Sequence, residues 1–235
     1  MKNAKLIYSL KKNNEHLKIC RDNVWPSIMS SKGSILCVSN GFIGIPKTTI
    51  LQIIAHPDIK SWQTSQGAWS SIDNASIKRE SVRILRPINS QPKLNIPPED
   101  RKNIYEYRKY LINPVYLNEF TKCFDESIYP HLKSLDIPLV GIWTLSASTS
   151  PLEIIQMTGY DNIIHWDQTR IELSKLDDNQ NELWNRGKAL RDRFDKITIE
   201  SSVILMESTY HYINNSFLKF RIHNTCILAS KPKII

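Results

Sequence analysis

An internal repeat restricts what this chain can fold into more than any other feature of its sequence. The sequence pattern of residues 104–170 also occurs, in diverged form, about 104 residues earlier in the chain. An aromatic-Pro pair, an apolar-apolar-Gln strand and an Ile-x-x-Trp step recur in one register without a gap. The matched segments are Trp25-Pro26 with Tyr129-Pro130, Ile50-Leu51-Gln52 with Ile154-Ile155-Gln156, and Ile59 and Trp62 with Ile163 and Trp166. The repeat predicts two similar halves.

Hydrophobic periodicity predicts the same order of elements in each half. In the first half we expect strands at 4–10, 35–39, 48–55 and 81–85, a turn at 40–44, a helix broken near Trp25 by Pro26, and a helix from Asp58. In the second half we expect strands at 104–110, 139–145, 152–160 and 199–206, a helix at 115–135 kinked at Pro130, and a helix at 162–194 bent at 177–181.

Each half therefore has the order βαββαβ, which is the ferredoxin-like arrangement. The predicted fold class is α+β, with two tandem ferredoxin-like domains whose antiparallel sheets pack into an α/β barrel. We expect the barrel to form within one polypeptide, as an intramolecular pseudo-dimer, and a further homodimer stays open. The predicted boundaries are 1–88 for the first repeat, 89–102 for a Pro-rich linker, 103–208 for the second repeat, and 209–235 for a tail that is strand-like at 221–228.

Composition narrows the functional classes. The chain is 41% hydrophobic and 23% charged, which is typical of a globular protein, and no segment has the apolar length of a membrane span. The net charge of +8 is spread without a dense basic block, so nucleic acid is not the expected partner. We expect a cytoplasmic protein, because the first residues turn charged too soon for a secretory signal. We expect buried thiols and no metal, because the four cysteines and six histidines show no metal-ligand spacing. We also expect no cofactor.

Two motifs that would indicate other chemistry are absent or lack their context. Gly41 and Gly44 precede a strand, whereas a dinucleotide-binding loop precedes a helix, so we interpret them as part of a hairpin. The chain has no G-x-S-x-G motif, so a nucleophile-elbow hydrolase is not supported.

The second half resembles the NIPSNAP family of the dimeric α/β-barrel superfamily. The resemblance is carried by Tyr105-Glu106-Tyr107-Arg108-Lys109-Tyr110, Asn113-Pro114, Phe120, Val140-Gly141-Ile142-Trp143, and the Ile154 to Tyr160 strand followed by Asp161. It covers residues 104–206, and residues 4–86 only through the repeat. The chain departs from the family at Thr158, where an aromatic residue is usual, and in its first strand, which reads Ile7-Tyr8-Ser9-Leu10. The resemblance implies a ligand pocket between helices and sheet, in a superfamily that includes cofactor-free monooxygenases, haem-degrading enzymes, isomerases and polyketide cyclases.

Strand alternation gives the first candidate site residues. Glu106 and Arg108 share one face of the strand at 104–110, where Arg108 could hold a carboxylate or enolate and Glu106 could move a proton. The alternative is a purely structural ion pair. His131 follows the helix break and is a candidate general base, since its ordinary pKa is near neutrality, although a solvated helix-end histidine would look the same. Tyr160, at the end of its strand, completes the predicted catalytic set.

Aromatic residues and histidines near these positions are the predicted substrate-binding residues. They are Tyr129, Trp143, His165, Trp166, His56 and Trp62. The first half holds Ser27, Ser39 and His56 where the second half holds His131, Trp143 and Tyr160, so acid-base function is predicted to reside in the second half.

These residues favour a tailoring enzyme that acts on a hydrophobic, oxygenated small molecule such as a polyketide-like intermediate. It would hydrolyse, cyclise or isomerise this substrate by cofactor-free acid-base chemistry. One alternative is a non-catalytic ligand-binding or scaffold protein. The other is a haem- or quinol-directed monooxygenase, with His56, His131 or His165 as the haem ligand.

Overall fold

The structure is a computed structural model that describes residues 2–10, 13–71, 77–88, 93–147, 150–170 and 178–209. The strands are β1 (Lys2–Leu10), β2 (Ser34–Ile43), β3 (Ile50–Ala55), β4 (Ile77–Pro87), β5 (Ile104–Ile112), β6 (Leu139–Leu145), β7 (Leu152–Tyr160) and β8 (Thr198–Ser208). The helices are α1 (Asn13–Ile19), α2 (Trp25–Ser30), α3 (Ile59–Ser65), α4 (Leu117–Cys123), α5 (Tyr129–Ser134), α6 (Ile163–Gln168), α7 (Asp178–Arg186) and α8 (Lys188–Ile197). Most of the predicted tail, including 221–228, lies outside the described residues.

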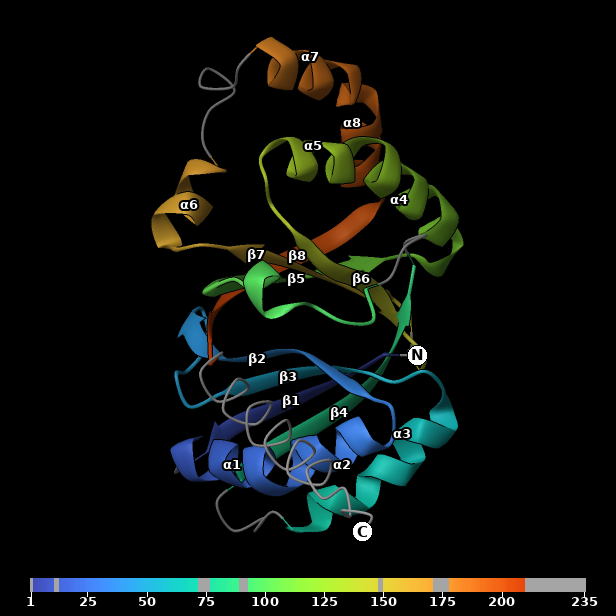
Figure 1. The fold of residues 1–235 in the computed structure, drawn as a ribbon. Helices are drawn as coiled ribbons and strands as arrows, with labels where there is room; N and C mark the ends of the chain where they lie inside the picture. Colours follow the sequence, from blue (N-terminus) through green and yellow to red (C-terminus); the bar gives the residue numbers. More distant parts are fainter. Residues whose placement is uncertain are drawn as a thin grey trace, which may run out of the picture.

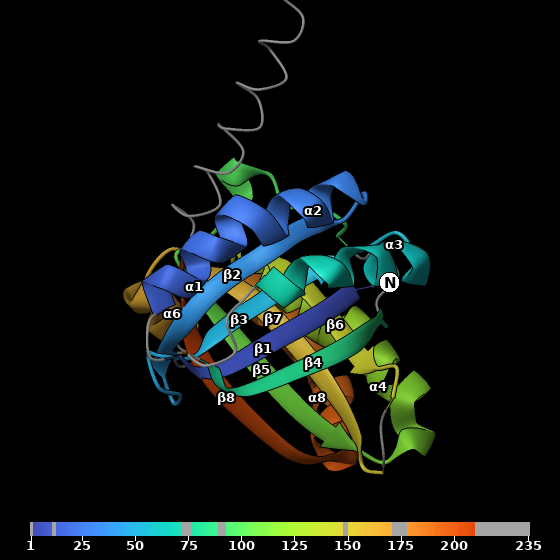
Figure 2. The ribbon, with the colours of Figure 1, turned by 90° about the horizontal axis from the view of Figure 1, so that it is seen from below.

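The eight strands form a closed antiparallel barrel in the order β1-β3-β2-β8-β5-β7-β6-β4. Each half supplies four neighbouring strands in the ferredoxin-like order, and two seams join the halves, β2 with β8 and β4 with β6. Helices α1 to α3 cover the outer face of one sheet, and helices α4, α5, α7 and α8 cover the outer face of the other (Figures 1 and 2). The predicted α+β fold, with a barrel closed within one polypeptide, is confirmed.

The two halves match in detail as well as in order. Both have a π-helical turn directly before the aromatic-Pro pair, at Cys20–Val24 and at Phe124–Ile128. Both second helical segments begin at an extended residue whose side chain accepts a hydrogen bond from a backbone N–H three residues on, Asp58 from Ser61 and Asn162 from His165. The π-helical turns and the side-chain N-caps are therefore common to both repeats.

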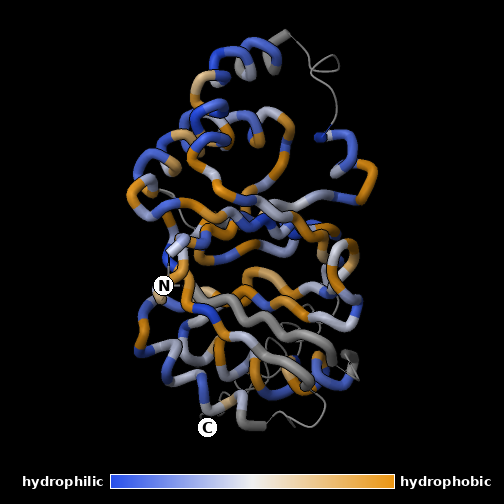
Figure 3. The backbone as a smooth tube through the Cα atoms, turned by 180° about the vertical axis from the view of Figure 1, so that it is seen from behind, coloured by the Kyte–Doolittle hydropathy of each residue, from blue (hydrophilic) through white to orange (hydrophobic). Residues whose placement is uncertain are grey.

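Apolar residues fill both the barrel interior and the space under the helices. The interior cluster includes Tyr105, Tyr107, Trp143, Met157 and Met206. Ile96, from the segment between the halves, is only 4% exposed and packs into the same cluster. Figure 3 shows hydrophobic stretches recurring along the strands of both sheets. Tyr105 and Tyr107 thus face inward, so Glu106 and Arg108 face the helices, as strand alternation predicts.

Two local predictions were wrong. The turn expected at 40–44 is mostly strand, because β2 continues to Ile43 and the chain turns at Gly44, whose φ is +80°. The helix expected at 162–194 is divided: α6 ends at Gln168, residues 171–177 lie outside the described residues, and Gly187 separates α7 from α8. Within the described residues a break falls at Gly187, and the predicted bend at 177–181 lies partly outside the described residues.

The helices expected to kink at Pro26 and Pro130 instead contain the two π-helical turns. A proline lacks the N–H that an α-helical hydrogen bond requires, and its ring crowds the carbonyl four residues earlier. A wider turn ahead of the proline relieves this crowding.

Candidate functional site

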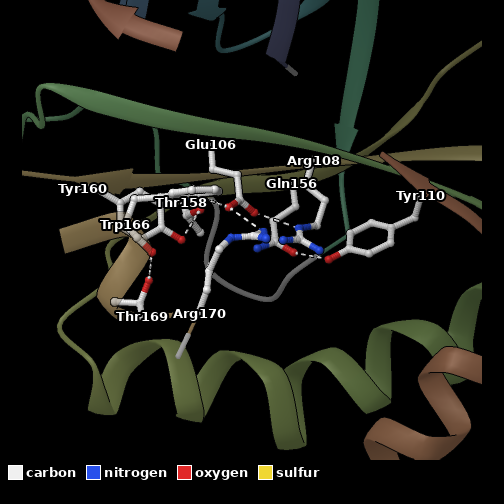
Figure 4. Close-up of polar contacts among 9 residues, drawn as sticks. All are labelled: Glu106, Arg108, Tyr110, Gln156, Thr158, Tyr160, Trp166, Thr169 and Arg170. Carbon is white, nitrogen blue, oxygen red and sulfur yellow. Dashed lines mark hydrogen bonds and ion pairs between the residues drawn. The ribbon is translucent and has the colours of Figure 1, made fainter. Parts of the chain in front are cut away.

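A pocket of about 490 Å³ lies between the outer face of the second sheet and helices α5 to α8. Strands β5 and β7 contribute its polar floor, which Figure 4 shows in close-up. Helices α5 and α8 contribute apolar side chains and a second group of charges. The lining of the pocket includes Glu106, Arg108, Tyr110, Ile128, His131, Leu132, Leu135, Ile137, Gln156, Tyr160, Arg170, Trp184, Lys188, Arg191, Asp192, Phe194 and Asp195.

Glu106 is the most heavily contacted side chain of the floor. It is 3% exposed and accepts hydrogen bonds from Arg108 Nε at 2.7 Å, Trp166 Nε1 at 2.6 Å and Arg170 Nη2 at 3.4 Å. The guanidinium of Arg170 also lies over the Trp166 ring, 4.3 Å from its centroid. Three donors engage both carboxylate oxygens, so Glu106 fixes the guanidinium of Arg108.

Arg108 is the cation at the centre of the floor. Burial disfavours its charge, yet the nearby oxygens of Tyr110 and Glu106 more than offset burial and raise its pKa above the ordinary value. The phenol of Tyr110 donates to Gln156 Oε1 at 2.9 Å beside it. The arrangement keeps the positive charge of Arg108 in the floor of the pocket.

Tyr160 supplies a protonated phenol to the same floor. Burial and the charge of Glu106 raise its pKa to about 12. Thr158 Oγ1 donates to the Tyr160 oxygen at 3.4 Å, which leaves the phenolic O–H available to donate to another acceptor. Near neutral pH this group can donate a hydrogen bond to an oxyanion.

His131 lies on α5, at the helix side of the pocket. Its ring centroid is 4.6 Å from that of Trp184, and its Nδ1 is buried without a hydrogen-bond partner among the described residues. Burial and the charge of Arg191 lower its pKa. His131 is therefore a neutral imidazole at neutral pH.

The structure brings the four predicted catalytic residues, Glu106, Arg108, His131 and Tyr160, to this one pocket. Trp166 lies directly behind it, with its indole N–H on Glu106. His165 packs edge-on against Tyr160, with ring centroids 5.7 Å apart, and its Nδ1 lies 3.4 Å from Asp161.

The other predicted binding residues lie elsewhere. Trp143 is fully buried in the barrel interior, and Tyr129 is 40% exposed and lines a separate pocket beside α5. His56 and Trp62 belong to the first half, where His56 Nδ1 is 3.1 Å from Ser61 Oγ. None of the four lines the 490 Å³ pocket.

Sequence reasoning did not select five residues of the pocket: Tyr110, Gln156, Arg170, Trp184 and Arg191. Gln156 could have been found, because a glutamine recurs in the same strand of both halves and an amide inside an apolar strand needs a polar partner. Arg170, Trp184 and Arg191 gave no such signal, because their positions depend on how the divided helix folds back over the sheet.

The described residues contain no group of three or more His, Cys, Asp or Glu side chains that could hold a metal ion. None of the described helices has the length and apolar character needed to span a membrane. Of the four cysteines, Cys20, Cys37 and Cys123 are buried and form no disulfide, and Cys226 lies outside the described residues.

Comparison with known proteins finds relatives for part of the chain and similar folds for most of it. No family model matches the chain. NipSnap homolog 3B of Mus musculus is 29% identical over 93 residues, which is 40% of this chain and 37% of that protein. The chain thus matches little more than a third of this relative, over about the length of one repeat.

Solved structures match over nearly the whole chain. A protein of Lactobacillus acidophilus NCFM, proposed to be a monooxygenase, superposes with a TM-score of 0.59 at 12% identity, covering 87% of this chain and 91% of that one. An anthrone oxidase-like protein superposes with a TM-score of 0.56 at 11% identity, covering 88% and 90%. At such low identity these likenesses establish the fold alone. The chain is therefore similar to a NIPSNAP relative over about the length of one repeat, and it folds as an α/β barrel closed within one polypeptide.

Proposed function

We propose that this chain is a small-molecule tailoring enzyme that moves a proton at a carbon next to a carbonyl group, on a hydrophobic, oxygenated substrate. The observation that carries the proposal is that a single pocket combines a neutral imidazole with an unpaired nitrogen, a fixed guanidinium and a protonated phenol. These are the three groups that enolisation requires: a base and two stabilisers of the resulting oxyanion.

In this mechanism His131 removes the proton, because its lowered pKa keeps it neutral and able to accept one. Arg108 and Tyr160 stabilise the enolate oxygen, the first by charge and the second by donating its phenolic O–H. Glu106 positions Arg108 and does not carry the proton, since its oxygens are already engaged by three donors. The enolate would then be reprotonated at another atom or would attack a second carbonyl, so isomerisation and cyclisation fit this site better than hydrolysis.

The proposal is tested on the substrate identified by mass spectrometry of small molecules retained by the purified protein. Arg108→Ala and His131→Ala should each lower turnover by about a hundredfold or more, the usual range for losing a charge stabiliser or a general base. His56→Ala, in the first half, should have a smaller effect. Circular dichroism and thermal melting must show that the variants are folded. Full activity in both second-half variants, with loss in His56→Ala, would assign the site to the other half.

A non-catalytic ligand-binding or scaffold role is the first alternative. It predicts that the retained small molecule leaves the protein chemically unchanged. It also predicts that Arg108→Ala and His131→Ala alter only the affinity for that molecule.

Haem- or quinol-directed oxygenation is the second alternative. It is favoured by His131, which could hold a haem iron, and by Arg108 and Arg170, which could pair with the carboxylates of a haem. A bound haem would supply the oxygen chemistry. Optical titration with haem separates this role from the leading one, since it requires a Soret shift that His131→Ala abolishes.

A further inference from the structure

Arg191 is a buried cation at the helix side of the pocket. The residue is 8% exposed, its Nη1 donates to Ser127 Oγ at 3.2 Å, and its Nη2 donates to the carbonyl oxygen of Trp184. Its guanidinium also stacks on the Trp184 ring, 3.4 Å from the centroid. All of these partners are neutral.

No carboxylate among the described residues lies within ion-pair distance of Arg191. Two other cations of α8 do have acid partners: Lys188 Nζ is 2.6 Å from Asp192, and Arg193 Nε is 2.6 Å from Glu119. Burial lowers the pKa of Arg191, opposed by the more distant charges of Asp192 and Asp195. A buried charge without a counter-charge is costly, and proteins generally retain one where a counter-charge is supplied.

The surrounding backbone is shaped to hold this cation. A Cβ at Gly187 would lie 2.4 Å from Ser127 Oγ and 2.8 Å from Arg191 Nη1, so only glycine leaves room for the pair. Ser127 Oγ in turn donates to the Gly187 carbonyl oxygen at 3.0 Å. The guanidinium is therefore preorganised, although its partners leave its charge uncompensated.

The unpaired Nδ1 of His131 lies at the same end of the pocket, because Trp184 contacts both His131 and Arg191. The same pocket is also lined by the apolar side chains of Ile128, Leu132 and Phe194. The pocket thus holds two cations, Arg108, which is paired with Glu106, and Arg191, which has no acid partner among the described residues.

We propose that the Arg191 end is a carboxylate subsite, so that the pocket takes an amphiphilic carboxylic acid with its carboxylate on Arg191 and its apolar body along Ile128, Leu132 and Phe194. The proposal names the substrate class of the same pocket and rests on the proposed function for the view that this pocket is the substrate site. A monoanion fits better than a dianion, because Asp192 and Asp195 line the same end and Lys188 is already paired. The carbonyl group that the proposed reaction requires would then lie toward Arg108 and Tyr160.

Binding of decanoate and decanol, measured by isothermal titration calorimetry at pH 7.5, tests the subsite without requiring turnover. Decanoate should bind the wild-type protein at least about tenfold more tightly than decanol, since a charge-assisted hydrogen bond contributes about 1.5–3 kcal/mol. Arg191→Gln should remove this preference while leaving decanol affinity unchanged. Arg193→Gln is the matched control, because this exposed arginine lies on the same helix, pairs with Glu119 and does not line the pocket.

Two results would overturn the subsite. Equal affinity of the wild-type protein for decanoate and decanol excludes it, and this comparison depends on no variant. Loss of decanoate binding in Arg108→Gln but not in Arg191→Gln places the carboxylate at the opposite end. A different result would contradict the proposed function and leave the subsite intact. In that case the protein still prefers decanoate to decanol through Arg191, but His131→Ala keeps full turnover on the retained substrate.

Discussion

At the scale of single residues, one tryptophan distinguishes the two halves. In the first half Trp25 is fully buried and donates its indole N–H to Gln52 Oε1 at 2.9 Å, so it occupies the space under the helix. Its counterpart Tyr129 is 40% exposed and turns outward, and Gln156 is left to line the pocket beside Tyr110. Duplication thus produced one filled half and one open half.

The histidine in the open half leads to a pH prediction. Burial, and to a smaller extent Arg191, lower the pKa of His131 in the folded protein, whereas in the unfolded chain it is about 6.5. Between these two values the unfolded chain binds more protons, so stability is fully retained above about pH 6.5 and falls as pH drops toward the folded pKa. NMR titration of the His131 ring should give a pKa below 6.5.

Replacing the neighbouring cation tests the cause of this shift. Arg191→Gln should raise the pKa of His131 without restoring its ordinary value, because burial is the larger cause. Arg193→Gln should leave it unchanged. A wild-type value at or above 6.5, or no response to Arg191→Gln, would contradict the assignment of His131 as a neutral base beside a buried cation.

At the scale of elements, strand β6 shows how a glycine and a tryptophan depend on one another. A Cβ at Gly141 would lie 2.1 Å from a ring carbon of Trp143, so the indole lies across the glycine inside the barrel. Gly141→Ala should therefore displace the buried ring and destabilise the protein by about 1–3 kcal/mol. Thermal or urea unfolding measures this cost.

Gly67→Ala is the matched control for the loss of stability predicted for Gly141→Ala. A Cβ at Gly67 would meet no atom within 4 Å, so this change should be neutral or stabilising by up to about 1 kcal/mol. Equal unfolding midpoints for the two variants would show that Trp143 does not depend on Gly141 for its position.

At the scale of the whole molecule, the barrel depends on two seams between the halves. Strand β2 pairs with β8, β4 pairs with β6, and an ion pair between Arg83 and Glu153 links the two halves. The interior cluster draws on both sheets and on Ile96 of the connecting segment. Each half therefore buries its inner sheet face only against the other.

Separation of the halves tests this dependence. Residues 1–90 and 99–235, expressed alone, should each expose an apolar sheet face and two strand edges, and should aggregate or associate. Size-exclusion chromatography with light scattering measures the outcome, and co-expression should yield a one-to-one complex. Two halves that are each soluble and monomeric would contradict this architecture.

The sequence by itself determined the duplicated βαββαβ order and the strand faces. Trp25-Pro26 with Tyr129-Pro130 and the paired Gln residues are local patterns, and strand alternation is enough to place Glu106 and Arg108 on the helix side. Only the tertiary structure decided which aromatic residues reach the pocket and which cations lack an acid partner. Trp143 points into the barrel, Tyr129 turns outward, and α8 folds back to bring Arg191 beside His131. These outcomes depend on packing between segments distant in the chain, and no local propensity encodes that packing.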